Sequence, residues 1–131
     1  MPGYTRITPT ADDWVATRTL AEYGRTYVDL TKRLGLKESR ARFWSYPVGA
    51  AGVPHIEREQ EEIFVVLRGT LTLLLGDPAS RETLPAGSVV AVSPGTAIHV
   101  RNDSDAEVAF LAYGAPPVAD AADTVPVPGS A

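Results

Sequence analysis

The sequence predicts an all-β fold in which two sheets close on each other, with an extended arm at each end. Three observations predict this class. Short apolar runs rich in β-branched and aromatic residues recur along the chain, as is typical of strands. The 11 glycines and 11 prolines separate these runs at regular spacing. No long helical pattern is present, so helices are not expected to build the core.

The length of 131 residues suits a single domain with one core. Residues 1–25 are predicted to form an N-terminal arm, because the prolines near its start oppose a helix. The barrel is predicted over residues 26–113, and its first strand is expected at Arg25–Leu30. The segment Thr31–Ser39, with Leu and Gly among charged neighbours, is expected to be a connection.

An aromatic strand is predicted at Arg40–Tyr46. Because side chains alternate along a strand, Arg40, Arg42, Trp44 and Tyr46 lie on one face. The pattern leaves open whether this face points into the barrel. On an outward face the two arginines would be solvated, whereas an inward Arg42 would either clamp a substrate carboxylate or neutralise Glu57.

The stretch Gly52–Gly69 is the centre of the predicted site. His55 and Glu57 are two residues apart, so in a strand they point the same way. Glu62 begins a β-branched and aromatic run, Ile63–Leu67, that predicts a second strand. A hairpin of the two strands would bring Glu62 back beside His55 and Glu57, so that one imidazole and two carboxylates share one interior.

The remainder of the barrel is predicted from alternating strands and Gly- or Pro-containing turns. Residues 114–131 have no periodicity and are expected to be a C-terminal tail, either an extended arm or disordered. The further strands are expected at Thr70–Leu75, Arg81–Leu84, Val89–Val92, Ala97–Arg101 and Glu107–Tyr113.

The central stretch resembles the first signature motif of the cupins, which runs from a glycine through His-x-His and a glutamate to a second glycine. His55 matches the first histidine, Glu57 stands at the second, and Glu62 matches the glutamate, since six residues separate it from Gly69. A second cupin-like stretch follows at Gly87–Asn102. The resemblance implies a jelly-roll cupin barrel with a cavity at one mouth.

The resemblance also implies a metal centre, because cupins bind one ion through the two histidines, the glutamate and a later histidine. The ligands here would be His55, Glu57 and Glu62, and the ion a divalent iron, manganese, zinc or nickel. The motif spacing places Ile98 at the later histidine, whereas a bulge before it would turn His99 inward as a fourth ligand. A metal-free site remains the alternative, with His55, Glu57 and Glu62 as general acid and base.

Together these features predict an enzyme of small-molecule metabolism, with a non-catalytic metabolite sensor as the alternative. A net charge of −4 without a basic patch argues against nucleic acid as a partner. No apolar run approaches the length of a membrane helix. The chain has no cysteine and no recognisable secretory signal, which fits a cytoplasmic protein. A homodimer is expected, since cupins commonly pair through sheet faces and the arms and aromatic strand offer surface.

Overall fold

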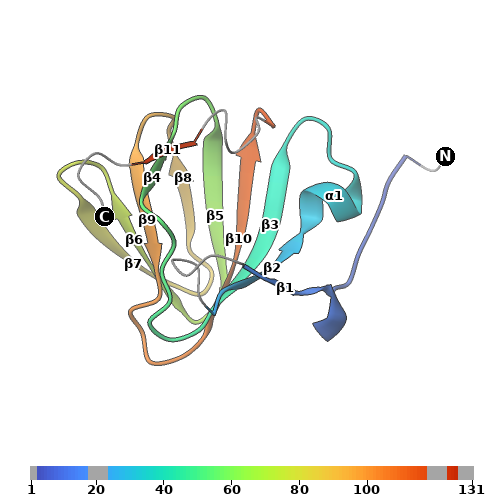
Figure 1. The fold of residues 1–131 in the computed structure, drawn as a ribbon, viewed down its shortest axis with the longest axis horizontal. Coiled ribbons are helices and arrows are strands. Elements are labelled where there is room, and N and C mark those ends of the chain that lie inside the picture. Colours follow the sequence, from blue (N-terminus) through green and yellow to red (C-terminus); the bar gives the residue numbers. More distant parts are fainter. Residues whose placement is uncertain (1–2, 18–23, 118–123, 127–131) are drawn as a thin grey trace.

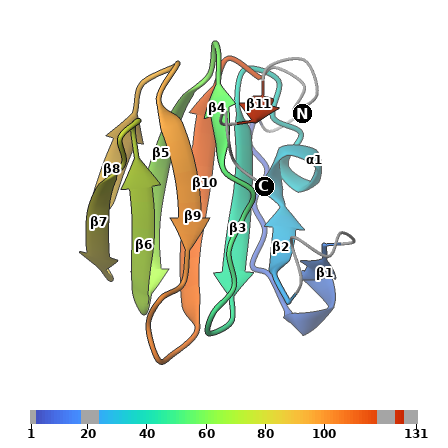
Figure 2. The ribbon, with the colours of Figure 1, turned by 60° about the vertical axis from the view of Figure 1, so that its left-hand side comes forward.

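The computed structural model describes residues 3–17, 24–117 and 124–126 of the chain. Two antiparallel sheets pack face to face and enclose the interior of a jelly-roll barrel (Figures 1 and 2), so the predicted all-β class is confirmed. The described residues add one 3-10 turn, η1 (Ala11–Asp13), and one short helix, α1 (Leu30–Leu34). None of their helices is long and apolar enough to cross a membrane.

The strands divide between a six-stranded and a five-stranded sheet. The first has the spatial order β1 (Val15–Ala16), β2 (Thr26–Asp29), β3 (Arg40–Tyr46), β10 (Val108–Ala115), β5 (Glu61–Arg68) and β8 (Val89–Val92). The second has the order β11 (Thr124–Pro126), β4 (His55–Glu57), β9 (Ala97–Arg101), β6 (Thr70–Leu75) and β7 (Ser80–Pro85).

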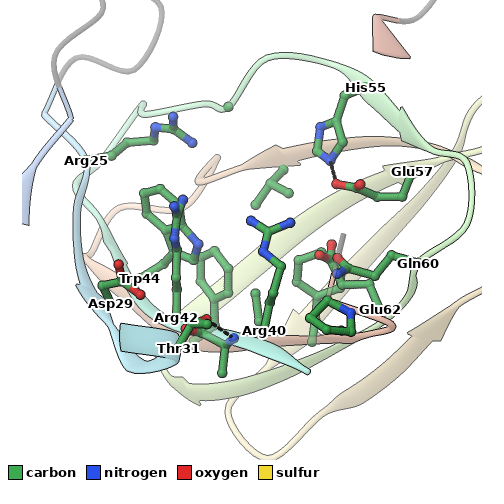
Figure 3. Close-up of a pocket in the computed structure, with 18 of the residues that line it drawn as sticks. Arg25, Asp29, Thr31, Arg40, Arg42, Trp44, His55, Glu57, Gln60 and Glu62 are labelled. Carbon is green, nitrogen blue, oxygen red and sulfur yellow. Dashed lines mark hydrogen bonds and ion pairs between the residues drawn. The ribbon is translucent and has the colours of Figure 1, made fainter. Parts of the chain in front are cut away.

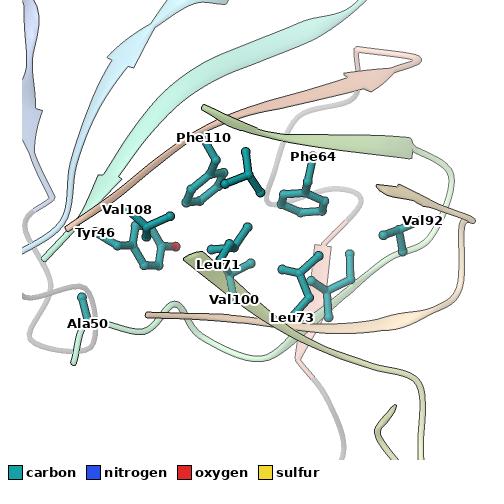
Figure 4. Packing of buried hydrophobic residues seen from close by; sticks show 11 residues of the cluster. Tyr46, Ala50, Phe64, Leu71, Leu73, Val92, Val100, Val108 and Phe110 are labelled. Atoms are coloured by element: carbon teal, nitrogen blue, oxygen red, sulfur yellow. The ribbon is translucent and has the colours of Figure 1, made fainter. Parts of the chain in front are cut away.

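The main core lies between the two sheets (Figure 4). Its largest fully buried side chain is Phe110 of β10, which packs against Phe64 of β5 with ring centroids 6.1 Å apart. Leu71 and Leu73 of β6 meet them from the opposite sheet and are fully buried. Because inward residues are two apart on each strand, the hydrophobic effect fixes which face of every strand points inward.

The aromatic strand β3 turns its arginine face into the barrel, since Tyr46 belongs to the main core and Trp44 packs against it. Its other face is also covered. Ala41 belongs to a second hydrophobic cluster on the outside of the six-stranded sheet, against which Ile7 and Trp14 of the N-terminal arm pack. The arm therefore shields this side of the sheet, so the aromatic strand does not supply the open surface expected for a dimer.

Two residues of the cupin-like motifs hold the barrel together. Gly69 has φ of +79°, and a Cβ there would lie 2.5 Å from the carbonyl oxygen of Glu107, so only glycine fits this crossing. Asn102 is fully buried at the end of β9. Its Nδ2 donates to the carbonyl oxygens of Tyr46 and Ala106, each at 2.9 Å, which joins the two sheets through one amide.

The predicted hairpin of the two site strands does not form. Strand β4 pairs with β9 and β11 in the five-stranded sheet, whereas β5 pairs with β10 and β8 in the other. The chain between them therefore crosses from one sheet to the other. In the C-terminal tail, which was expected to be either an extended arm or disordered, residues 124–126 form β11 along the edge of β4.

Candidate active site in the barrel

A cavity of about 840 Å³ lies between the sheets and is lined by side chains from both. The six-stranded sheet contributes inward residues of β2, β3, β10 and β5, and the five-stranded sheet contributes those of β4 and β9. This volume is within the range of pockets that enclose a small organic ligand, roughly 300–1,000 Å³. Figure 3 shows that charged side chains project into this cavity from opposite sides.

His55 and Glu57 lie on the same face of β4, as predicted from their spacing. The Nε2 atom of His55 is 3.2 Å from Oε1 of Glu57, and its Nδ1 is 2.9 Å from the carbonyl oxygen of Val53. A carbonyl oxygen only accepts hydrogen bonds, so Nδ1 must carry a proton. The backbone before β4 thereby fixes the tautomer and aims Nε2 at the Glu57 carboxylate.

Glu62 reaches the same place from the opposite sheet. One possible ligand atom from each of His55, Glu57 and Glu62 lies within 4.8 Å of the others, although the expected hairpin is absent. The reason is closure of the barrel, because the first residues of β5 lie across the interior from β4. The three residues, called the His–Glu cluster below, are therefore brought together by tertiary packing.

The fourth ligand considered from the sequence, His99, is not brought to this cluster. Ile98 is the direct partner of His55 across β9 and β4, so both side chains face inward, and Ile98 is buried in the core. The register of β9 against β6 runs without a shift, so no bulge reverses the strand. His99 consequently points to the outer face of the sheet, which corrects its assignment as a ligand.

The two histidines have opposite electrostatic surroundings. Burial alone would lower the pKa of His55, but its hydrogen bonds to Glu57 and Val53 and the charges of Glu57 and Glu62 outweigh burial, so the pKa is raised. For His99, burial lowers the pKa, and the positive charge of Arg101 lowers it further. The surroundings of His55 therefore favour its protonated form on balance, whereas those of His99 favour its neutral form.

A group of cations faces the His–Glu cluster across the cavity. Arg42 lies with its guanidinium 4.6 Å from the ring centre of Tyr27 and 5.7 Å from that of Trp44. Arg25 is buried and lies 4.8 Å from the ring centre of Trp44 and 5.1 Å from that of Tyr46. Sequence reasoning left the orientation of Arg42 open and did not single out Arg25. Arg25 comes directly before β2, two residues from Tyr27, and this alternation was the signal that could have found it.

Gly52 makes room for this packing. A Cβ at this position would lie 2.9 Å from a terminal nitrogen of Arg25 and 3.1 Å from the hydroxyl oxygen of Tyr46. The same Arg25 nitrogen donates a hydrogen bond to that hydroxyl oxygen. Gly52 therefore allows the side chains of Arg25 and Tyr46 to approach the backbone closely.

The His–Glu cluster fits a divalent cation by the chemistry of its donors. Imidazole nitrogen and carboxylate oxygen are the ligands of iron, manganese, zinc and nickel, and two carboxylates balance the charge of the ion. With Nδ1 protonated, the remaining lone pair of neutral His55 is on Nε2, which faces Glu57. The three residues can therefore act as ligands without rearrangement of the backbone.

Comparison with protein families matches residues 42–114, more than half of the chain, to the family described as Cupin domain. Among solved structures, the polyketide cyclase RemF from Streptomyces resistomycificus is similar with a TM-score of 0.77 and 19% identity, over 94% of this chain and 84% of that one. A cupin protein from Bacteroides fragilis has a TM-score of 0.71 and 20% identity, over 89% and 87% of the two chains.

A third structure, described as a sugar phosphate isomerase from a cupin superfamily, is from Silicibacter pomeroyi. It has a TM-score of 0.68 and 22% identity, over 84% of this chain and 81% of that one. A search of curated proteins finds no significant match. At these identities the structural likeness speaks for the fold alone. The family match, the jelly roll and the His–Glu cluster agree, and the chain belongs to the cupin family.

Proposed function

We propose that the chain is an enzyme that converts a small organic molecule inside the barrel, with the His–Glu cluster as its reactive group. The cavity is large enough for such a molecule, and the cluster lines it. Two structures of the same fold are described as a polyketide cyclase and a sugar phosphate isomerase, which makes cyclisation and isomerisation the reaction classes to test first.

One observation carries this proposal: both ring nitrogens of His55 face oxygen atoms of this chain. If the imidazole were neutral with its proton on Nδ1, the Nε2 lone pair would point at the Glu57 carboxylate, and the two would repel. A proton or a cation between Nε2 and Glu57 removes this repulsion. His55 and Glu57 make this contact in the lining of the cavity, where a ligand can reach them, and this favours a metal site or an acid–base pair over a structural ion pair.

The first form of the proposal is a divalent ion held by His55, Glu57 and Glu62. Such an ion would polarise a carbonyl or enolate oxygen of the ligand as a Lewis acid. The protein's own contribution is to fix Nε2 of His55 through the Val53 carbonyl and to supply two negative charges. Two carboxylates leave the ion a weaker Lewis acid than a ligand set of three histidines would.

The second form uses no metal and is favoured by the direct contact of His55 with Glu57, at 3.2 Å. A carboxylate of the cluster takes a proton from a carbon of the ligand, and the His55 imidazolium returns a proton to another atom of the same molecule. The proton count of the ligand is then unchanged, as isomerisation or cyclisation requires. The raised pKa of His55 keeps the imidazolium available near neutral pH.

The test is a calorimetric titration of chelator-treated protein with Mn²⁺, Fe²⁺, Zn²⁺ and Ni²⁺. The chain has two histidines, so His55→Ala and His99→Ala form a matched pair. We expect one ion per chain in the unaltered protein and in His99→Ala, and none in His55→Ala. If no ion binds but His55→Ala abolishes conversion of a substrate, the second form holds. If His55→Ala keeps full turnover, both forms fail, because the His–Glu cluster is then not the reactive group. If the chain binds a ligand but no ion and converts no substrate, it is a passive sensor.

We also propose that two copies of the chain associate. The outer face of β5 and β8 carries large apolar side chains in contact with solvent, with Val89 64% exposed and Leu67 51% exposed. The N-terminal arm packs over the outer side of β2 and β3, and no described residue of the arm belongs to the clusters around β5 and β8. An apolar sheet face of this kind is typical of a protein–protein interface.

A further inference from the structure

Cationic side chains line one side of the cavity, and the His–Glu cluster lines the other. The side with Arg40 and Arg42 is called the arginine pole below. The net charge of the lining differs from that of the whole chain. Its lining contains four cations and three carboxylates, a net charge of +1 with neutral His55. The chain as a whole carries −4. A positive cavity in an acidic protein attracts anions to that cavity in particular. The cationic residues of the lining are Arg25, Lys37, Arg40 and Arg42, and the carboxylates are Asp29, Glu57 and Glu62.

The arginines and the His–Glu cluster stand on opposite sides of a floor made of small residues. In the register of the six-stranded sheet, Ala112 of β10 lies directly between Arg42 of β3 and Phe64 of β5. Gly114 lies in the same way between Arg40 and Glu62. The side chain of Gln60 lies over Gly114, so the space for a ligand is that above Ala112.

The cationic side is held rigidly by aromatic rings. Arg42 lies over Tyr27 and Trp44, whose ring centroids are 5.1 Å apart. A guanidinium that stacks with its face still has five N–H donors in its own plane. These are enough both for Asp29, the cross-strand neighbour of Arg42, and for the carboxylate of a ligand. In Figure 3, Arg40 extends from β3 toward the centre of the cavity, between Arg42 and the His–Glu cluster.

We propose that the ligand of this cavity is an organic carboxylate with a flat apolar body. Its carboxylate is bound by Arg40 and Arg42, and its body lies over Ala112 between Trp44 and Phe64. The distal end of the molecule then reaches the His–Glu cluster. This inference rests on the proposed function only because both place a ligand in the cavity. It concerns Arg40 and Arg42, which take no part in the proposed reaction.

Two probes of equal shape and different charge test the inference: cinnamate and the neutral cinnamamide. Each is titrated into isotopically labelled protein with excess chelator, and the backbone and arginine side-chain signals are followed by NMR. The chelator removes any ion to which a carboxylate would bind directly. We expect cinnamate to bind at least about tenfold more tightly than cinnamamide, as a charge-assisted pair of hydrogen bonds would produce. The Nε–H signals of Arg40 and Arg42 should shift.

Substitutions distinguish direct binding of the carboxylate by the arginine pole from a general effect of positive charge. Arg42→Gln should lower the affinity for cinnamate about tenfold and leave that for cinnamamide unchanged. Arg101→Gln removes one positive charge from β9 outside the cavity lining and should change neither affinity. Arg42→Lys keeps the positive charge without the planar guanidinium, so its affinity for cinnamate should lie between those of wild type and Arg42→Gln. This variant replaces Arg42→Gln in the test if Arg42→Gln fails to fold.

Equal affinities for the two probes, no binding of either, or an equal loss in Arg101→Gln would overturn the inference. These results leave the proposed function standing, because it is read from ion binding and from the His55 variants. Conversely, a chain that binds no ion and keeps full turnover in His55→Ala does not use the His–Glu cluster as its reactive group. It would still prefer cinnamate if the arginine pole binds carboxylates.

Discussion

At Glu57 the chain has a carboxylate where the first cupin motif has its second histidine. Glu57 is buried on β4, with its side chain 8% exposed, and its Oε1 contacts Nε2 of His55. A carboxylate here adds a negative charge to the site that a histidine would not. The preference of a His–Glu cluster should therefore move toward harder ions such as manganese and iron and away from cuprous copper.

Glu57→Gln tests this role with little change of shape. We expect the affinity for Mn²⁺ to fall roughly 100-fold or more, since losing even an outer hydrogen-bond partner of a metal ligand costs about 10- to 100-fold. The unfolding temperature should change much less than the affinity. Glu59→Gln makes the same chemical change on an exposed turn residue and should leave the affinity as it is. An equal loss of Mn²⁺ affinity in the two variants would show that the overall charge of the protein, and not ligation by Glu57, causes the loss.

The raised pKa of His55 predicts how the stability of metal-free protein depends on pH. A group whose pKa is raised by folding stabilises the folded state fully below its unfolded pKa, here near 6.5, and loses this contribution as pH rises through the folded pKa. His99, with a lowered pKa, acts in the opposite direction. The quantity to measure is therefore the difference in free energy of unfolding between wild type and His55→Gln, by urea denaturation with chelator from about pH 5 to about pH 9.

We expect the advantage of wild type over His55→Gln to be largest at the acidic end and to decrease as the pH rises. His99→Gln should show the reverse trend relative to wild type, because it removes a group whose folded-state pKa is lowered. An advantage that does not vary with pH would mean that His55 is not held as a cation by Glu57 and Val53.

At the residue scale the sequence predicted the members of the site better than their arrangement. His55, Glu57 and Glu62 are two and five residues apart, and their common location was predictable from strand alternation and from the motif. Two things were not predictable. The choice between Ile98 and His99 depends on whether a strand contains a bulge, which is a property of the register. The inward face of Arg42 depends on what covers each side of β3.

At the scale of elements, the site depends most on β4, which carries both His55 and Glu57. With only three residues, this strand relies on its neighbours for stability. It pairs with β9 on one side and with β11 on the other. Strand β11 lies in a segment whose composition indicates no structure. Pairing with an open edge can order such a segment where its own periodicity cannot, which is why the sequence did not predict it.

Removal of β11 tests its support of the site. A chain that ends at residue 117 lacks β11, whereas one that ends at residue 126 keeps it. We expect the shorter chain to lose roughly 1–3 kcal/mol in free energy of unfolding, the value of a few ladder hydrogen bonds, and to bind Mn²⁺ more weakly. The longer chain should behave as wild type. Amide exchange at Ile56 is the most direct readout, and unchanged exchange in the shorter chain would contradict the role of β11.

Most strands of the barrel were predictable from the sequence, and the reason lies in their environment. Strands β3, β6, β8 and β9 have the bounds expected from alternation and turns, because each has a buried and a less buried face between strong turn signals. The pairing of β4 with β9 was not predictable. It joins residues about 40 positions apart, and local pattern carries no information about such contacts.

At the scale of the whole molecule, the outer face of β5 and β8 is the surface proposed for a second copy. Val89→Lys together with Leu67→Lys should make the chain monomeric, since two charges would be buried unpaired in the interface. Val48→Lys alters a loop residue that is 59% exposed and serves as the control. Sedimentation at micromolar concentration provides the measurement. A wild-type monomer, or a dimer that survives the double substitution, would exclude this face as the interface.

His55, Glu57 and Glu62 are proposed to form one reactive centre, and the whole proposed function depends on this arrangement. The most direct test is a crystal structure of protein loaded with Mn²⁺, with anomalous scattering recorded above and below an absorption edge of the metal. We expect one anomalous peak per chain in contact with Nε2 of His55 and with oxygens of Glu57 and Glu62, with His99 outside the centre. A peak at any other set of ligands, or a side chain of the cluster turned to the outer surface, would contradict it.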